Sequence, residues 1–230
     1  MGVSVTRGEA YDSVYYLADI HVRDVRALRT AFGGGGYYNG NEAVSTLARK
    51  NGAKLAVNGD YYSFRSAGPL VRNGEIYRDY VTANLDLLVL SKDGSMHALS
   101  KGSAKKDAVY ALDPWQTWSF GPSLLDEQGK GKTVFQSELT KKNPRTAIGY
   151  YEPGHYALLV VDGRRRGYSE GMELWELSSL CEQLGMKVAY NLDGGQSTAM
   201  ASQTQLINQP LSEGRPVSDI ICVCEPEEEA

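Results

Sequence analysis

The chain has 230 residues, of which 42% are hydrophobic and 23% are charged, and its formal net charge at neutral pH is −4. These proportions are close to globular averages, and no apolar run is long enough to cross a membrane as a helix. Lysine and arginine residues are scattered along the sequence, so no broad basic face indicates a nucleic-acid partner. We predict a single domain over residues 1–224, followed by an acidic flexible tail at 225–230.

The first part of the chain contains short apolar segments that are separated by turn residues. Residues 14–20 and 54–57 are predicted to be strands. Between them, residues 41–50 are predicted to form a helix that ends at Asn51-Gly52. The glycine run at 33–36 is predicted to be a mobile surface loop, since it lacks the lysine that a nucleotide-binding P-loop needs.

Two hairpins follow these elements. Residues 70–77 have Asn73-Gly74 at their centre, and residues 85–99 have Asp93-Gly94. Such pairs favour the tight turns that connect antiparallel strands. The sequence therefore predicts local antiparallel pairing in this region.

The clearest helix is predicted over residues 172–184. Leu174, Leu177, Cys181 and Leu184 recur at spacings of three and four, and Gly185 ends the pattern. Together with the hairpins, this helix indicates an α+β fold: a single domain with a mixed, largely antiparallel β-sheet flanked by a few helices.

The cysteines do not indicate a disulfide framework or a zinc site. Cys181, Cys222 and Cys224 are odd in number, and apolar residues surround the last two. We therefore predict three buried free thiols.

Three strand-like segments end in an aspartate beside a glycine. Asp60 follows residues 54–57, Asp162 follows 156–161, and Asp193 lies in the polar loop 191–198. Each dipeptide is also explained as a tight turn, but polar groups at strand ends commonly assemble a site on a rigid scaffold. Because carboxylate oxygens are the ligands of hard cations, calcium or magnesium is a possible cofactor, although no calcium-binding loop motif is present.

Several segments, taken in order, resemble the phosphodiester glycosidase domain family. They are NGDYY (58–62), VRNGEIY (71–77), FGPSL (120–124), NPRTAIG (143–149), VDGR (161–164) with YSEG (168–171), NLDGG (191–195) and RPVSD (215–219). One position departs from the family pattern, because Gln196 stands where a third glycine is usual. The resemblance implies a hydrolase that cleaves a sugar-1-phosphodiester of the N-acetylglucosamine-1-phosphate type. We expect no cofactor beyond the possible divalent cation.

A glycosidase commonly uses a pair of carboxylates at the anomeric carbon. On this basis Asp193 is the leading catalytic candidate, followed by Glu170 and Asp60. Glu170 is also explained by its position before the predicted helix, where negative charge complements the helix dipole.

Arginine suits the phosphate, because its planar fork holds two oxygens and keeps its charge. Arg145 and Arg164 are the leading candidates, with Arg72 third, and an ordinary ion pair is the other interpretation of each. Asp162 is placed in an orienting role. The further predicted substrate-binding residues are Asn58, Asn191, Gly194, Gly195, Ser197 and Thr198.

Two other functions stay open. Gln196 raises the possibility of a non-catalytic module that binds sugar phosphates or glycans, and a phosphodiesterase that breaks the P–O bond is the second. The expected partner is a small sugar phosphate or a glycopolymer of the cell envelope or exopolysaccharide. No apolar leader follows Met1, so an extracytoplasmic location is expected only if an export segment has been removed. Oligomeric state is not predicted.

Overall fold

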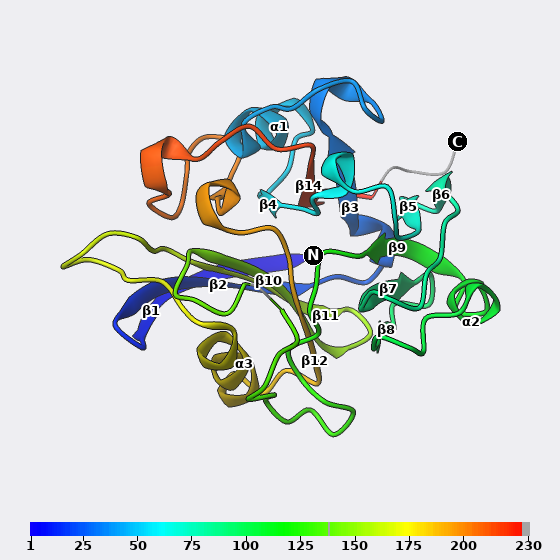
Figure 1. Ribbon diagram of the computed structural model, residues 1–230. Coiled ribbons are helices and arrows are strands. Elements are labelled where there is room, and N and C mark those ends of the chain that lie inside the picture. The colour runs from blue at the N-terminus through cyan, green and yellow to red at the C-terminus, as the bar shows by residue number, and fades with distance from the viewer. Residues whose placement is uncertain (138, 227–230) are drawn as a thin grey trace.

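The computed structural model describes residues 1–137 and 139–226, and it places two antiparallel sheets face to face between two helices (Figure 1). The first sheet has the order β1 (Gly2–Ala10), β2 (Ser13–His21), β11 (His155–Val161), β10 (Arg145–Glu152) and β12 (Val188–Asn191). The second has the order β13 (Met200–Ala201), β4 (Leu55–Asn58), β14 (Asp219–Val223) and β3 (Leu28–Phe32). Helix α1 (Val44–Lys50) covers the outer face of the second sheet, and α3 (Leu174–Gln183) covers that of the first.

The alternation of side chains along the strands explains this layering. In β11, Leu158 and Val160 belong to the core between the sheets, whereas Leu159 and Val161 pack on the α3 side. In β14, Ile221 faces the same central core and Cys222 faces α1. Because successive side chains of a strand point to opposite faces, β11 after His155 and β14 after Asp219 are apolar on both faces.

A smaller sheet and a hairpin extend the fold on one side. The sheet has the order β8 (Met96–Leu99), β7 (Leu87–Ser91) and β9 (Pro114–Trp118), and the hairpin consists of β5 (Leu70–Arg72) and β6 (Glu75–Arg78). Leu88 and Leu90 reach the central core, and α2 (Lys106–Tyr110) packs against the other face of β7. Short 3-10 turns lie at Val25–Ala27, Gly33–Gly35, Tyr62–Phe64, Gly195–Ser197 and Leu211–Glu213.

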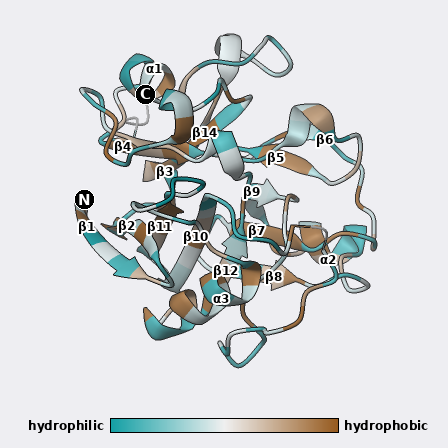
Figure 2. Ribbon diagram, turned by 60° about the vertical axis from the view of Figure 1, so that its left-hand side comes forward, coloured by the Kyte–Doolittle hydropathy of each residue, from teal (hydrophilic) through white to brown (hydrophobic). Residues whose placement is uncertain are grey.

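The edge strand β1 is largely exposed and hydrophilic (Figure 2). It pairs with β2 along its whole length, from Gly2 opposite His21 to Ala10 opposite Ser13. Polar and charged residues on an edge strand discourage pairing with another chain. No helix of the described residues is long and apolar enough to span a membrane.

The predicted α+β fold with largely antiparallel sheets is confirmed, and both hairpins form at the expected turns. Both helices begin later than predicted. Glu42 bridges to Val217 before α1, and Met172 bridges to Asn143 before α3, so these backbone groups bond to distant segments rather than to a helix.

Two smaller predictions have different outcomes. All three cysteines are buried and none of them forms a disulfide, as expected. Of the predicted acidic tail, Glu225 forms an exposed ion pair with Lys54, and residues 227–230 lie outside the described part of the chain.

Candidate active site

The candidate site surrounds the loop that follows β12. Asp193 in this loop borders a hollow of about 60 Å³, which the end of β4 and the segment 215–218 also line. Asp193 borders a second hollow as well, of about 240 Å³, on the side of Arg145 and Arg164. We call these the small hollow and the arginine-lined hollow.

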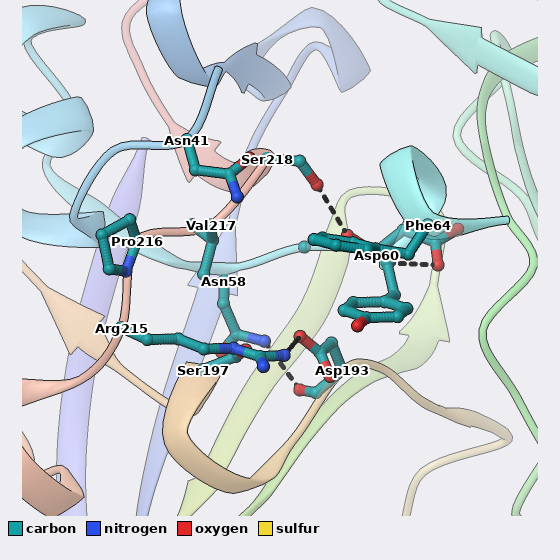
Figure 3. Close-up of a pocket in the computed structure, with 12 residues that line it drawn as sticks. Asn41, Asn58, Asp60, Phe64, Asp193, Ser197, Arg215, Pro216, Val217 and Ser218 are labelled. Carbon is teal, nitrogen blue, oxygen red and sulfur yellow. Dashed lines mark hydrogen bonds and ion pairs between the residues drawn. The ribbon is translucent and has the colours of Figure 1, made fainter. Parts of the chain in front are cut away.

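Asp193 is held between its own loop and Arg215. In Figure 3 the Arg215 side chain extends toward Asp193, and an Arg215 Nη2 atom lies 3.0 Å from Asp193 Oδ2. The other oxygen accepts the Gly194 N–H at 2.9 Å. Only 13% of the Asp193 side chain is exposed, and this burial raises the pKa of its carboxyl even though the Ser197 hydroxyl and Arg215 act in the opposite direction.

Arg215 is the main functional candidate that sequence analysis missed. Its Nε donates to Ser197 Oγ at 2.6 Å, and its backbone N–H donates to the Gln196 carbonyl. Its guanidinium also lies 5.5 Å from the centre of the Tyr61 ring. Although RPVSD belongs to the motif series, only the fold shows that this segment crosses the 191–198 loop.

Arg145 and Arg164 both line the arginine-lined hollow, together with Arg215. Arg145 is buried, and its guanidinium donates to the carbonyls of Met172, Leu139 and Lys141. Burial and the nearby positive charge of Arg164 lower the pKa of Arg145 to about 10, so it stays charged at neutral pH. The two predicted phosphate ligands are thus brought together.

Arg164 is the more accessible of the two. Its Nε and Nη2 atoms donate to Asn143 Oδ1 at 3.1 and 2.7 Å, and its backbone has a φ of +58°. A Cβ atom at Gly195 would lie 3.2 Å from Arg164 Nη2, and Gly195 itself has a φ of +64°. Glycine at position 195 therefore allows both the turn and the close approach of the guanidinium.

Asn58 fastens the Asp193 loop to the second sheet. Its Nδ2 donates to the Asp193 carbonyl at 2.7 Å, while its Oδ1 accepts from the Thr146 hydroxyl and the Ala199 N–H. Thr146 also bonds to the hydroxyl of Thr198. Asn58 and Thr198 thus position the loop, because the side chains of both are bonded to other groups of the protein.

Asp60 lines the small hollow, but backbone groups occupy its carboxylate. Its oxygens accept the N–H groups of Tyr61 at 2.8 Å and of Ser119 at 2.7 Å. The side chain is almost fully buried. This arrangement supports a positioning role for Asp60 more than the predicted catalytic one.

Arg72 lies behind the site, where no ligand reaches it. Its side chain is 0% exposed and pairs with Asp219 at 2.9 Å, and Asp60 lies 4.0 Å away. Complete burial raises the pKa of Asp219 to about 6, although the charge of Arg72 opposes the shift. Arg72 therefore neutralises buried carboxylates, and the structure does not support its predicted contact with phosphate.

Glu170 does not join the site either. It is exposed and borders a separate hollow with Asp12 and Lys142. No residue of that hollow borders those around Asp193. Glu170 and Asp193, both predicted to be catalytic, thus line different hollows.

The remaining predicted residues support the loop from behind. Asp162 is buried and accepts hydrogen bonds from Asn208, Gln209 and Tyr168, so it anchors the segment that holds Met200 and Thr198. Asn191 donates to the Gly121 carbonyl.

The three aspartates considered as possible cation ligands do not lie together. Among the described residues, the carboxylates of Asp60, Asp162 and Asp193 do not gather within the 4.8 Å that a shared cation would require. Backbone and side-chain donors engage the oxygens of all three instead. This ligand set for calcium or magnesium is therefore not supported.

A partly buried carboxylate and three arginines thus line one hollow, and Arg215 is paired with the carboxylate. Residues 51–224 match the phosphodiester glycosidase family, and the chain belongs to this family, as the sequence motifs predicted.

Curated relatives carry one name, N-acetylglucosamine-1-phosphodiester alpha-N-acetylglucosaminidase. The Mus musculus protein is 30% identical over 100 residues, which are 40% of this chain and 19% of that protein. The Bos taurus protein is 33% identical over 90 residues, or 36% of this chain and 17% of that protein. The match thus spans less than a fifth of the length of these relatives.

Solved structures show the same fold over nearly the whole chain. The catalytic domain of the zebrafish enzyme of that name, auto-inhibited by its pro-peptide, has a TM-score of 0.76 and 20% identity, and the match covers 97% of this chain and 82% of that one. A hypothetical protein from Synechocystis has a TM-score of 0.65 at 16% identity, covering 96% and 61%. A putative exported protein from Burkholderia pseudomallei also has 0.65, at 14% identity, covering 92% and 74%.

The placement of Arg72 gives a test of its structural role. Replacing Arg72 with methionine leaves the charges of Asp60 and Asp219 buried without their partner, which costs about 3–5 kcal/mol of stability. The Arg164→Met variant, at an exposed position, should change the free energy of unfolding by less than about 0.5 kcal/mol. Urea denaturation measures both, and equal stability of the two variants contradicts the assignment.

Proposed function

We propose that this protein hydrolyses a sugar-1-phosphodiester at the bond between the anomeric carbon and oxygen, with Asp193 as the carboxylate at that carbon. The observation behind the proposal is the position of Asp193, which borders both hollows. A substrate whose phosphate enters the arginine-lined hollow then has its sugar beside Asp193.

The arginine-lined hollow has the chemistry that a phosphodiester needs. Three guanidinium groups and one carboxylate line it, so it has an excess of positive charge. Arg145 is fixed by three carbonyls and supplies charge, whereas Arg164 is exposed and uses only its Nε and Nη2 atoms in the contact with Asn143. A planar fork of this kind holds two phosphate oxygens at once.

One partly exposed carboxylate beside the hollows is consistent with this reaction. The departing group is a phosphate monoester, which leaves far more readily than an alcohol and needs little protonation. The general acid of an ordinary glycosidase is then dispensable, and the remaining requirement is negative charge at the oxocarbenium-like carbon. Asp193 meets it because 13% of its side chain is exposed, whereas the Asp60 side chain is 1% exposed and accepts two backbone amides.

Aromatic side chains lie where the sugar is proposed to bind. Tyr61 and Phe64 are stacked with ring centres 4.3 Å apart, and Phe120 stands edge-on to Tyr61. Tyr61 and Phe64 line the small hollow, and Phe120 lines the other. Such rings offer an apolar surface to the face of a pyranose.

The names of the relatives support N-acetylglucosamine as the sugar. We further propose a glycopolymer of the cell envelope or exopolysaccharide as substrate and an extracytoplasmic location. The location agrees with the structural neighbour from Burkholderia pseudomallei, which is named as an exported protein. Gln196 lines the arginine-lined hollow, so it is proposed to contact the group attached beyond the phosphate.

Isotope labelling tests the reaction and separates it from the other two functions. In oxygen-18 water, hydrolysis of an N-acetylglucosamine-1-phosphodiester should place the label in the sugar, as mass spectrometry detects. Label in the phosphate indicates P–O cleavage, and saturable binding without release indicates a binding module. Either outcome overturns the proposal.

The role of Asp193 is tested by the Asp193→Asn variant. Its turnover should fall by roughly 10²–10⁴-fold, because the amide keeps the shape of the side chain but lacks its charge. Asp107→Asn is the matched control, since Asp107 is exposed and borders neither hollow, and it should keep full turnover. An active Asp193→Asn enzyme removes Asp193 from the mechanism.

The Arg164→Met variant tests phosphate recognition. It removes an exposed charge from the arginine-lined hollow, so KM for the phosphodiester should rise by roughly 10-fold or more, as expected for a lost hydrogen bond to a charged group. Hydrolysis of an uncharged aryl N-acetylglucosaminide should change little. A similar loss on both substrates contradicts the assignment.

The pH profile reports on Asp193 directly. Because burial raises the pKa of this carboxyl, the acid limb of kcat/KM should lie at higher pH than for an ordinary aspartate. Arg215 lowers the same pKa, so Arg215→Gln should move the acid limb further toward neutral pH. An unmoved limb contradicts the ionisation of Asp193 as its origin.

A further inference from the structure

A second cluster of reactive side chains lies at the opposite end of β10 and β11 from the proposed active site. It consists of Asp19, His21 and His155. Strand β10 begins at Arg145, beside Asp193, whereas this cluster lies where β11 begins. No residue that borders either hollow around Asp193 belongs to it.

We propose that Asp19, His21 and His155 bind a transition-metal ion, with Zn²⁺ as the fitting ion. One ligand atom from each residue lies within 4.8 Å of the other two. His155 Nε2 is 2.7 Å from Asp19 Oδ1, and His21 Nε2 is 3.2 Å from Asp19 Oδ2. Neighbouring ligands of tetrahedral zinc stand roughly 3.3 Å apart, which is close to these two separations.

Strand pairing holds these side chains on one face. His21 is directly opposite His155 in the register of β2 and β11, and Asp19 is two residues before His21 on the same strand. The alternation of side chains therefore directs Asp19 and His21 to the same side. Ligands on adjacent paired strands are pre-organised, which lowers the entropic cost of binding.

Ring stacking further restricts the two imidazoles. The rings of His21 and His155 are 4.0 Å apart with 23° between their planes, and Tyr151 stacks on the other side of His155 at 4.2 Å. A metal lies in the plane of each ligating ring, so the imidazoles must tilt toward each other. His21 has room for this movement, since 59% of its side chain is exposed and Gly2 is its partner on β1.

The cluster has space for a fourth ligand. His21 and His155 border a hollow of about 330 Å³ that Glu152 also lines. Three protein ligands with an open fourth position form the arrangement of a zinc site that keeps a bound water. Two imidazoles and one carboxylate favour zinc over calcium or magnesium, which prefer oxygen ligands throughout.

Zinc titration by calorimetry after removal of metal by a chelator tests this site. One Zn²⁺ per chain should bind, and Co²⁺ in its place should show the visible absorption of a tetrahedral ion. His21→Ala and His155→Ala should each weaken binding by more than the roughly 10–100-fold that loss of an outer hydrogen-bonding partner costs. Asp19→Asn should weaken it as well.

The third histidine of the chain provides a matched control. His97 lies on β8 and bonds to Ser95, outside the cluster, so His97→Ala should bind Zn²⁺ as the wild type does. The buried thiols of Cys222 and Cys224 lie 3.6 Å apart, and the Cys222→Ser variant checks them as a competing site.

Two further variants guard against loss of the fold. His21→Gln and His155→Gln keep a polar side chain of similar size, and circular dichroism confirms their structure. Absence of saturable binding, binding that survives both alanine variants, or binding lost only in Cys222→Ser overturns the proposal.

Discussion

The candidate site depends on the burial of three charges behind it. Arg72, Asp60 and Asp219 have almost no contact with solvent, so each needs hydrogen-bonding partners in fixed positions. Asp219 accepts the Asp60 N–H, and Asp60 in turn accepts those of Tyr61 and Ser119. The start of β14, the end of β4 and the end of β9 are thereby joined where the small hollow is formed. A shift of one partner leaves a buried charge unpaired, which explains why these loops have one arrangement.

The arginines around the candidate site have different roles because their partners and their exposure to solvent differ. Arg72 balances buried carboxylates, and Arg145 clamps three carbonyls while it supplies charge to the hollow. Arg164 and Arg215 have exposed guanidinium groups, and one of them is paired with Asp193. The pair with Asp193 fixes the position of the carboxylate, and in the reaction we propose this would supply the pre-organisation that electrostatic catalysis requires.

The two ends of the first sheet have different chemistry. At the Asp193 end, irregular loops bring together residues that are far apart in the sequence, and buried amides and carbonyls hold them. At the His155 end, regular strand pairing is sufficient to place Asp19, His21 and His155 on one face. Strands β10 and β11 thus have at one end a site that loops assemble and at the other end a cluster that strand pairing assembles.

The sequence by itself determined the local structure and the family. Turn dipeptides such as Asn73-Gly74 specify hairpins through backbone conformation, and the spacing of Leu174, Leu177 and Cys181 specifies the face of a helix, so both were predictable from neighbouring residues. The family motifs also placed Asp193, Arg145 and Arg164 among the candidates, and these three line one hollow.

Only the tertiary structure decided which charged residues share a site. Arg72 and Arg164 look alike in the sequence, but Arg72 is buried with Asp219 whereas Arg164 lines the arginine-lined hollow. Glu170 and Asp193 also look alike, but Glu170 lines a separate hollow. Arg215 became a candidate because segment 215–218 crosses the loop of Asp193. Burial, ion pairing and proximity between distant segments arise from the packing of the two sheets, and no local pattern of residues encodes them.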